Sequence, residues 1–182
     1  QILQTFKIIK KTRFYEDGTV IVYSDASEDY YKTIKTKFVD GRTTIKKYYS
    51  ETSWESSKEC DKDGYKVSYF NDYDKITDYY YSGQLCDDDS AVRKMKSQRY
   101  MDEHVTEITE YYNDEDNRKS RLIYTTYDSN GKTTSEEVTV HHNDEDNRKN
   151  QLTKTNYNEN GKKVSEEVTI HNNDSYNRKN QS

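Results

Sequence analysis

The chain has 182 residues, of which 35% are charged, and its mean hydropathy is −1.36. The formal net charge is only −5, because 29 basic residues nearly balance 34 acidic ones, so the basic surface that nucleic acid requires is not expected. No apolar run reaches the roughly 18 residues of a membrane-spanning helix. We therefore expect neither a nucleic-acid partner nor a membrane span.

The residue types predict strands rather than disorder. Leu, Ile, Val and Phe make up only 28 of the 182 residues, a fraction typical of disordered chains. The 19 tyrosines and the absence of proline point the other way. Tyrosine, threonine, valine and isoleucine favour strands. The composition therefore predicts an ordered all-β chain with little buried core.

Residues 1–81 are predicted to form an irregular region of β-hairpins. Turns are expected at three Asp-Gly pairs, Asp17-Gly18, Asp40-Gly41 and Asp63-Gly64, and a further strand at residues 75–81. This region also holds most of the Phe, Ile and Trp side chains. We expect a more compact cap built from these residues and nearby valines: Phe6, Ile8, Ile9, Phe14, Val20, Val22 and Trp54.

Residues 82–110 are predicted to be a degenerate repeat. Residues 89–104 contain a capping Ser90 and good helix formers, so a helix is the alternative to a strand there. Alignment with the later repeats puts "VRKMKSQRY" in the place of "NQLTKTNY", and this favours the strand. Residues 24–34 leave the same two alternatives open.

Residues 111–182 are tandem 30-residue repeats. Residues 111–140 and 141–170 are identical at 18 of 30 positions, and a partial third copy spans residues 171–182, which leads us to expect that the natural chain continues or is processed there. Each full copy contains two candidate strands, a turn at Asn130-Gly131 or Asn160-Gly161, and the acidic connector "NDEDNRK". We expect tight primed turns with positive φ at Asn and Gly. The pattern predicts a meander of roughly a dozen antiparallel strands.

Alternation along the last strand indicates a thin sheet. One face carries Val164, Glu166, Val168 and Ile170, and the other carries Lys163, Ser165, Glu167 and Thr169. Even the apolar face contains a glutamate, so neither a sandwich nor a closed barrel is expected. We predict an extended antiparallel β-meander of tandem hairpin repeats, a largely single-layer or loosely coiled sheet. Cross-strand pairs of ~0.2–1 kcal/mol each would stabilise it.

Three short stretches carry resemblances to known families. "TTYDSNGKTTSEE" resembles a tandem tyrosine–aspartate repeat of the bacterial Rhs type, with Tyr127, Asp128, Gly131 and Lys132 in the Tyr, Asp, Gly and basic positions. Asn158 replaces the Asp in the next copy, and the longer arginine-containing consensus is absent. "FYEDGTVIVY" is similar to the hairpins of MORN-variant repeat proteins, and the Lys/Glu/Thr-rich meander is similar to the single-layer sheet of spirochaetal outer-surface lipoproteins. Together they imply a non-catalytic β-repeat protein of a surface, secreted or toxin-associated kind.

The acidic connectors are the candidate metal site. Connectors two strands apart lie about 10 Å apart at one end of a meander, so their acids would form a row. The candidate calcium ligands are Asp114, Glu115, Asp116, Asp144, Glu145 and Asp146. The spacing is not that of an EF-hand, and the adjacent Arg-Lys pairs can neutralise the acids. A solvated turn is favoured, calcium is the alternative, and no other cofactor is expected.

Cysteine, asparagine and histidine give the remaining candidates. Cys60 and Cys86 form the candidate disulfide, with two free thiols as the alternative. Asn173 and Asn180 begin N-glycosylation patterns. We interpret the four histidines as aromatic packing rather than metal ligands, since the neighbours His141 and His142 point to opposite faces of a strand: His104, His141, His142 and His171.

No catalytic constellation is evident, and we do not expect an enzyme. We expect a structural or surface-exposed protein, a spacer, fibre subunit or adhesive stalk, located extracellularly or at the cell surface. It would self-associate through sheet edges or contact other surface proteins or glycans. One alternative is a calcium-dependent or glycan- or protein-binding module that uses the tyrosine clusters or the acidic connectors. Another is an intracellular MORN-like interaction or antitoxin protein.

Overall fold

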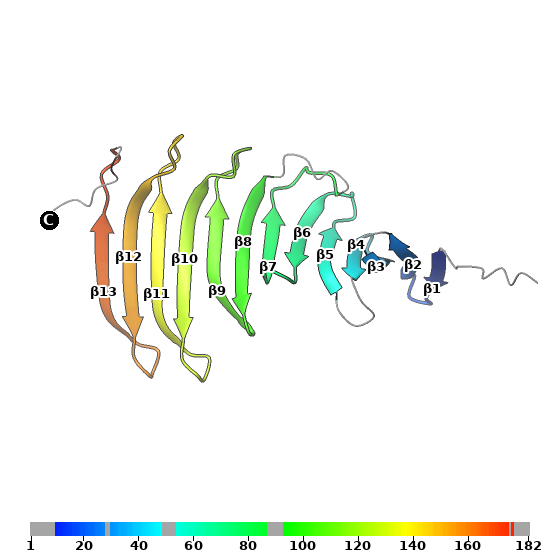
Figure 1. The fold of residues 1–182 in the computed structure, drawn as a ribbon, viewed down its shortest axis with the longest axis horizontal. Coiled ribbons are helices and arrows are strands. Elements are labelled where there is room, and N and C mark those ends of the chain that lie inside the picture. Colours follow the sequence, from blue (N-terminus) through cyan, green and yellow to red (C-terminus); the bar gives the residue numbers. More distant parts are fainter. Residues whose placement is uncertain (1–9, 28–29, 49–53, 87–92, 175, 177–182) are drawn as a thin grey trace, which may run out of the picture. The chain divides into compact units, whose positions relative to one another are not determined.

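The computed structural model describes residues 10–27, 30–48, 54–86, 93–174 and 176. Every regular element in these residues is a β-strand, which confirms the predicted all-β class (Figure 1). This part of the chain accordingly contains no helix that could cross a membrane. The contacts divide the chain into two compact units. Unit 1 comprises Gln1–Asp74 with Ser82–Ser90, and unit 2 comprises Lys75–Tyr81 with Ala91–Ser182.

Unit 1 contains six strands that pair antiparallel in chain order. They are β1 (Lys10–Phe14), β2 (Val20–Ser27), β3 (Tyr30–Lys37), β4 (Thr43–Tyr48), β5 (Trp54–Cys60) and β6 (Lys66–Asn71). Residues 20–27 and 30–37 are strands, so the helical alternative for this region is wrong. The turns that join β1 to β2, β3 to β4 and β5 to β6 are short, and each contains an Asp-Gly pair that favours a hairpin.

The turns of unit 1 recur every 23 residues. Their glycines, Gly18, Gly41 and Gly64, all adopt left-handed backbone angles, with φ of 84°, 89° and 84°. The turns also stack, because a Cβ placed on Gly41 would lie 2.8 Å from the Cβ of Lys62 in the following turn. Only glycine fits such an approach. Unit 1 is thus a hairpin array with its own period of 23 residues.

Unit 2 contains seven strands, again antiparallel and in chain order (Figure 1). They are β7 (Ile76–Tyr80), β8 (Lys94–Met101), β9 (His104–Tyr111), β10 (Lys119–Tyr127), β11 (Thr133–His141), β12 (Lys149–Tyr157) and β13 (Lys163–Ile170). The strand β8 decides between the two alternatives for residues 89–104 in favour of the strand. Residues 87–92 lie outside the described part of the chain.

The turns between β10 and β11 and between β12 and β13 stand where the Asn-Gly pairs predict them, but their type differs. Gly131 and Gly161 have positive φ, whereas Asn130 and Asn160 do not. The Gly131 amide donates to the Asp128 carbonyl (3.0 Å), and the register shifts at Thr126/Tyr127. These features describe a β-turn followed by a glycine bulge, so the prediction of a primed turn was wrong.

The sheet of each unit is a single layer. Among the described residues, strands of one unit contact only the strands beside them in sequence. Thr109, Leu122, Thr139 and Leu152 form one cross-strand row, and Ile108, Ile123 and Val138 form an apolar row on the opposite face. Thr109 and Thr139 are each only 3% exposed, although they lie on the face predicted to be polar. Leu122 and Leu152 are their cross-strand partners on the adjacent strands. The alternation of residues along one strand does not reveal such cross-strand partners.

The predicted N-terminal cap is described only in part. Phe6, Ile8 and Ile9 and the Trp54 side chain lie outside the described part of the chain. Phe14 in β1 is 79% exposed, so this phenylalanine is not part of a core. In the described residues the buried hydrophobic side chains are those of Cys60 and Cys86 alone. The predicted cap and the predicted boundaries at residues 81 and 110 stay predictions.

Candidate functional site

The repeated connectors join β9 to β10 and β11 to β12 and have the same backbone path. The amide of Tyr112 donates to the Arg118 carbonyl (2.9 Å), and the amide of His142 donates to the Arg148 carbonyl (2.8 Å). The asparagine before each Arg-Lys pair is left-handed, with φ of 52° at Asn117 and 48° at Asn147. Asparagine tolerates this conformation better than most residues. The connector is therefore a built turn rather than a loose loop.

Asn147 fastens its connector to the preceding one. Its Oδ1 accepts from the Lys119 amide (2.9 Å), and its Nδ2 donates to the carbonyls of Lys119 (2.8 Å) and His142 (2.9 Å). We call these three bonds the asparagine clamp. Asn117 repeats part of the pattern one connector earlier, since its Oδ1 accepts from the Lys94 amide at 2.5 Å. A side-chain amide suits this role, because it carries an acceptor oxygen and a donor nitrogen side by side on one planar group.

The first asparagine of the connector forms a second link. Asn113 accepts from the Arg93 guanidinium, and Asn173 accepts from the Arg148 guanidinium, both at 3.1 Å. Asn173 also donates through Nδ2 to Asp144 Oδ2 (2.9 Å). Successive connectors are thus joined by side-chain contacts between residues 20 to 29 positions apart in sequence.

Three of the six candidate calcium ligands, Asp114, Asp144 and Asp146, are engaged by contacts of this kind. Asp114 accepts from the Arg118 amide and guanidinium, both at 3.2 Å, and Asp146 pairs with Arg148. Partial burial acts to raise the pKa of Asp114, but the hydrogen bonds from Arg118 outweigh it and lower that pKa. Glu115, Asp116 and Glu145 are exposed. Within the described ranges, no group of three acidic, histidine or cysteine side chains is arranged to hold a metal ion.

The Asp144 carboxylate takes part in the same network. Its Oδ1 accepts from the Asn147 amide at 2.9 Å. The hydrogen bond from Asn173, above all, lowers the pKa of Asp144, and the Asn147 amide, His142 and Arg148 act in the same direction. The carboxylate therefore stays ionised as part of the turn.

The histidines do not converge on one point. His141, at the end of β11, is 9% exposed, and no hydrogen-bond partner reaches its Nδ1. Burial, followed by the charges of Lys119 and Lys149, lowers the pKa of His141. His104 lies at the start of β9 against Tyr127. These positions place His141 and His104 in aromatic or sheet packing within unit 2.

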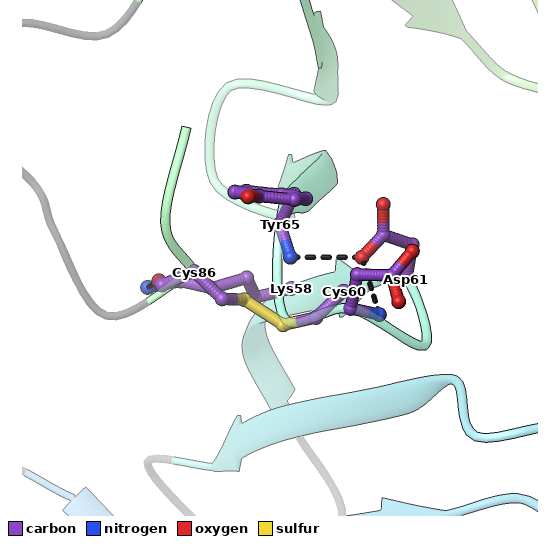
Figure 2. Close-up of a disulfide and its surroundings, with 6 residues drawn as sticks. Lys58, Cys60, Asp61, Tyr65 and Cys86 are labelled. Carbon is purple, nitrogen blue, oxygen red and sulfur yellow. Dashed lines mark hydrogen bonds between the residues drawn. A yellow bond between two sulfur atoms is a disulfide. The ribbon is translucent and has the colours of Figure 1, made fainter. Parts of the chain in front are cut away.

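Cys60 and Cys86 are joined by a disulfide in unit 1 (Figure 2). Their Cα atoms lie 5.9 Å apart across 26 residues of sequence, and both side chains are buried. The segment around Cys86 is also held by hydrogen bonds, from the Lys58 ammonium to the Cys86 carbonyl and from the Cys86 amide to the Gly64 carbonyl, both 2.9 Å. The crosslink therefore ties the segment that follows residue 81 to the β5–β6 turn.

Of the two candidate glycosylation asparagines, Asn173 lies within the described residues and Asn180 does not. The Asn173 side chain makes the contacts with Asp144 and Arg148 given above, so its Nδ2 is engaged by the preceding connector. Asn180 lies outside the described residues, as does Ser175 of the first pattern. Modification at either position stays a prediction.

The asparagine clamp was missed at the sequence level. Asn117 and Asn147 belong to the acidic connector "NDEDNRK", whose acids drew the prediction of a calcium site. An asparagine directly before Arg-Lys in all three copies, at residues 117, 147 and 177, was the available signal.

No protein-family model matches the chain, and no curated protein matches it either.

Proposed function

We propose that this chain is a non-catalytic structural β-repeat protein that acts as a spacer, fibre subunit or adhesive stalk. The observation that carries the proposal is the asparagine clamp, in which Asn147 hydrogen-bonds both the amide and the carbonyl of Lys119 in the preceding connector. The repeated residues of the chain are thus used to hold neighbouring hairpins together. A chain whose repeated residues join its own repeats is suited to forming an extended structure rather than an active site.

Two further features support a surface location. The disulfide between Cys60 and Cys86 is of a kind that persists in oxidising compartments, and the highly charged composition of the chain suits direct contact with water. The resemblance to Rhs-type repeats also belongs to this proposal. Tyr127, Asp128 and Gly131 lie in one turn, in which the Asp128 carboxylate accepts from the amides of Asn130 (2.8 Å) and Lys132 (2.9 Å).

The proposal includes self-association through a sheet edge. In the described part of the chain β13 pairs with β12 alone. Val164 and Val168 of β13 are 60% and 52% exposed, whereas Val138 at the position corresponding to Val168 is half-buried between its neighbours. An edge strand with exposed valines is a template for a further strand.

Electron microscopy and sedimentation velocity of the full chain over a concentration series test the proposal. We expect filaments or elongated oligomers that grow with concentration, and we expect Val168→Lys to abolish them, because an edge lysine blocks strand addition. The matched control is Val39→Lys in a turn of unit 1, where the side chain is 76% exposed. A chain that stays monomeric at all concentrations contradicts the self-association, as does a Val168→Lys variant that assembles like the wild type.

A further inference from the structure

A groove opens in unit 2 where two hairpins of different length lie side by side. The β8–β9 hairpin turns through Asp102 and Glu103 alone, whereas β10 and β11 are joined by residues 128–132. The groove has a volume of about 590 Å³, within the usual range for ligand sites. We call it the tyrosine groove, and its principal lining residues are Arg99, Met101, His104, Glu107, Tyr124 and Tyr127.

The next pair of hairpins differs at the same end. The Lys132 ammonium of the β10–β11 turn donates to the Glu159 carbonyl of the β12–β13 turn, so these two turns are in direct contact. The turn of the β8–β9 hairpin is shorter, and this hairpin meets the β10–β11 turn through His104 beside Gly131. The groove therefore forms because the hairpin turn within residues 82–110 is shorter than the turns of the regular repeats at residues 111–170.

One wall of the tyrosine groove is held rigidly. The rings of His104 and Tyr127 lie 4.7 Å apart between centroids and are tilted by 42°. The Tyr127 hydroxyl donates to the Val105 carbonyl (2.8 Å), which fixes that ring to β9. A Cβ on Gly131 would come within 2.5 Å of His104 Nε2, so the turn closes on the imidazole as only glycine allows.

The open part of the groove presents an aromatic and an aliphatic surface. Tyr124 is 45% exposed and Met101 is 67% exposed. Burial, followed by the charge and hydrogen bonding of Glu107, raises the pKa of Tyr124, so its hydroxyl stays protonated. A half-exposed tyrosine offers a ligand contact area at little cost in side-chain entropy.

Acids outnumber bases in the lining of the groove, with Asp102, Glu107 and Asp128 against Arg99. Arg99 lies 3.9 Å from Glu107, and the Asp128 carboxylate is occupied by the amides of Asn130 and Lys132. Hydrogen bonds from those amides lower the pKa of Asp128, since they stabilise its ionised form. This excess of acids disfavours a phosphate or a sulfate. A neutral ligand rich in hydroxyl groups fits, because carboxylates accept hydrogen bonds from hydroxyls. A lysine-rich peptide is the competing ligand.

A peptide strand is also disfavoured by the backbone. β9 is paired on both sides, to β8 along Lys96–Met101 and to β10 along Lys119–Tyr124. The groove therefore offers no free strand edge for β-augmentation, and recognition must come from side chains. A sugar ring suits this surface, because its C–H face packs on tyrosine while its hydroxyls bond Arg99, Glu107 and His104.

From these observations we propose that the tyrosine groove binds a neutral oligosaccharide, with a sugar ring packed on Tyr124 and its hydroxyls bonded by Arg99 and Glu107. This is a binding activity beyond the structural role proposed above and does not depend on it. It would give a stalk-like chain a point of contact with a glycan-bearing surface.

Saturation-transfer difference NMR and isothermal titration calorimetry of the full chain test the site. The probes are cellohexaose, maltohexaose, mannohexaose and chitohexaose at millimolar concentration, with hexalysine as the charged comparison. We expect at least one of the four sugars to bind and hexalysine not to. Tyr124→Ala should weaken that binding about tenfold, whereas Tyr73→Ala, at a 90% exposed tyrosine in unit 1, should leave it unchanged.

Circular dichroism first establishes that each variant is folded. Should Tyr124→Ala not fold, Met101→Lys is the second variant, since its side chain is largely exposed and a lysine there would obstruct the groove; the same weakening is expected. Three results overturn the proposal: no sugar binds, sugar binds the folded groove variant as tightly as the wild type, or hexalysine binds in place of the sugars.

Discussion

At the residue scale, the repeated asparagine is the most specific feature of the connectors. Asn147 is left-handed and uses both ends of its side-chain amide, one to accept from Lys119 and the other to donate to Lys119 and His142. An aspartate has the same shape and tolerates the same φ but has no donor when ionised. Replacing Asn147 by aspartate therefore removes the donor of the clamp while leaving the backbone conformation of the turn accessible.

We expect Asn147→Asp to lower the free energy of unfolding by about 1–3 kcal/mol, because two carbonyls lose their donor and face a carboxylate instead. Urea unfolding followed by circular dichroism measures the change. Asn130→Asp is the matched control, since Asn130 is exposed in the β10–β11 turn and its side chain can change charge with an effect within about 0.5 kcal/mol. Equal effects of the two substitutions would sink the clamp as a stabilising contact.

His141 makes the stability of unit 2 depend on pH. Burial and the nearby Lys119 and Lys149 lower the pKa of His141 in the folded state below 6.5, so the unfolded chain binds a proton more readily. The stabilising contribution of neutral His141 is thus fully present above pH 6.5 and is lost as the pH falls below it. The pH range of this loss lies below 6.5, because the pKa of His141 is lowered on folding.

His141→Tyr should reduce that pH dependence, because tyrosine stands at the corresponding Tyr111 and does not titrate between about pH 5 and pH 8. Urea midpoints of both proteins across this range provide the measurement. The wild type is expected to lose stability on acidification faster than the variant. Parallel midpoint curves would show that protonation of His141 does not contribute.

At the element scale, the sequence predicted where hairpins form better than how they are built. The 30-residue repeat located β10 to β13, because turn residues and strand residues alternate there without exception. Asn130 and Asn160 marked turns correctly, yet the turn type was wrong because the glycine bulge depends on the register of the flanking strands. The 23-residue period in unit 1 is carried by Gly18, Gly41 and Gly64, while the strand residues between them vary, so it is a weaker signal than the 30-residue repeat.

The clamp itself could not be derived from one repeat. Asn147 contacts Lys119, 28 residues earlier, and the pairing of connectors depends on strand lengths that set their stacking. The tyrosine groove was beyond sequence reasoning for a related reason. It arises from the difference between the turn at Asp102 and the turn at residues 128–132, and its Tyr124 and His104 come from different strands.

Calcium is expected to leave the connectors unchanged. Asp114, Asp144 and Asp146 are engaged by Arg118, Asn173 and Arg148, so a cation would have to displace these partners. We predict no change in melting temperature between a chelator-treated sample and one with millimolar calcium. A rise in melting temperature with calcium would restore the calcium site as the better interpretation of the acidic row.

The disulfide is predicted to stabilise unit 1. Closing 26 residues between Cys60 and Cys86 is worth about 3–4 kcal/mol in the chain-entropy description. Non-reducing mass spectrometry of the native protein should find no free thiol, and Cys60→Ala with Cys86→Ala should lower the stability by roughly that amount. Two free thiols in the native sample would contradict the crosslink.

At the scale of the whole molecule, stability comes from the sum of neighbour contacts. In the described residues each strand of a unit contacts only the strands beside it in sequence, and the buried hydrophobic side chains are the two half-cystines. No shared core makes the end of a unit depend on its beginning. Such arrays behave as a chain of coupled units, in which each repeat adds its own term and an interface term.

The most direct test of this account is to insert one more copy of residues 141–170 after residue 170 and to measure urea unfolding. If clamped repeats are the source of stability, the added copy should raise both the free energy of unfolding and its urea dependence, since more surface is buried on folding. The same insertion carrying Asn147→Asp in both copies should raise the free energy of unfolding less. An inserted copy that leaves both quantities unchanged would contradict the account.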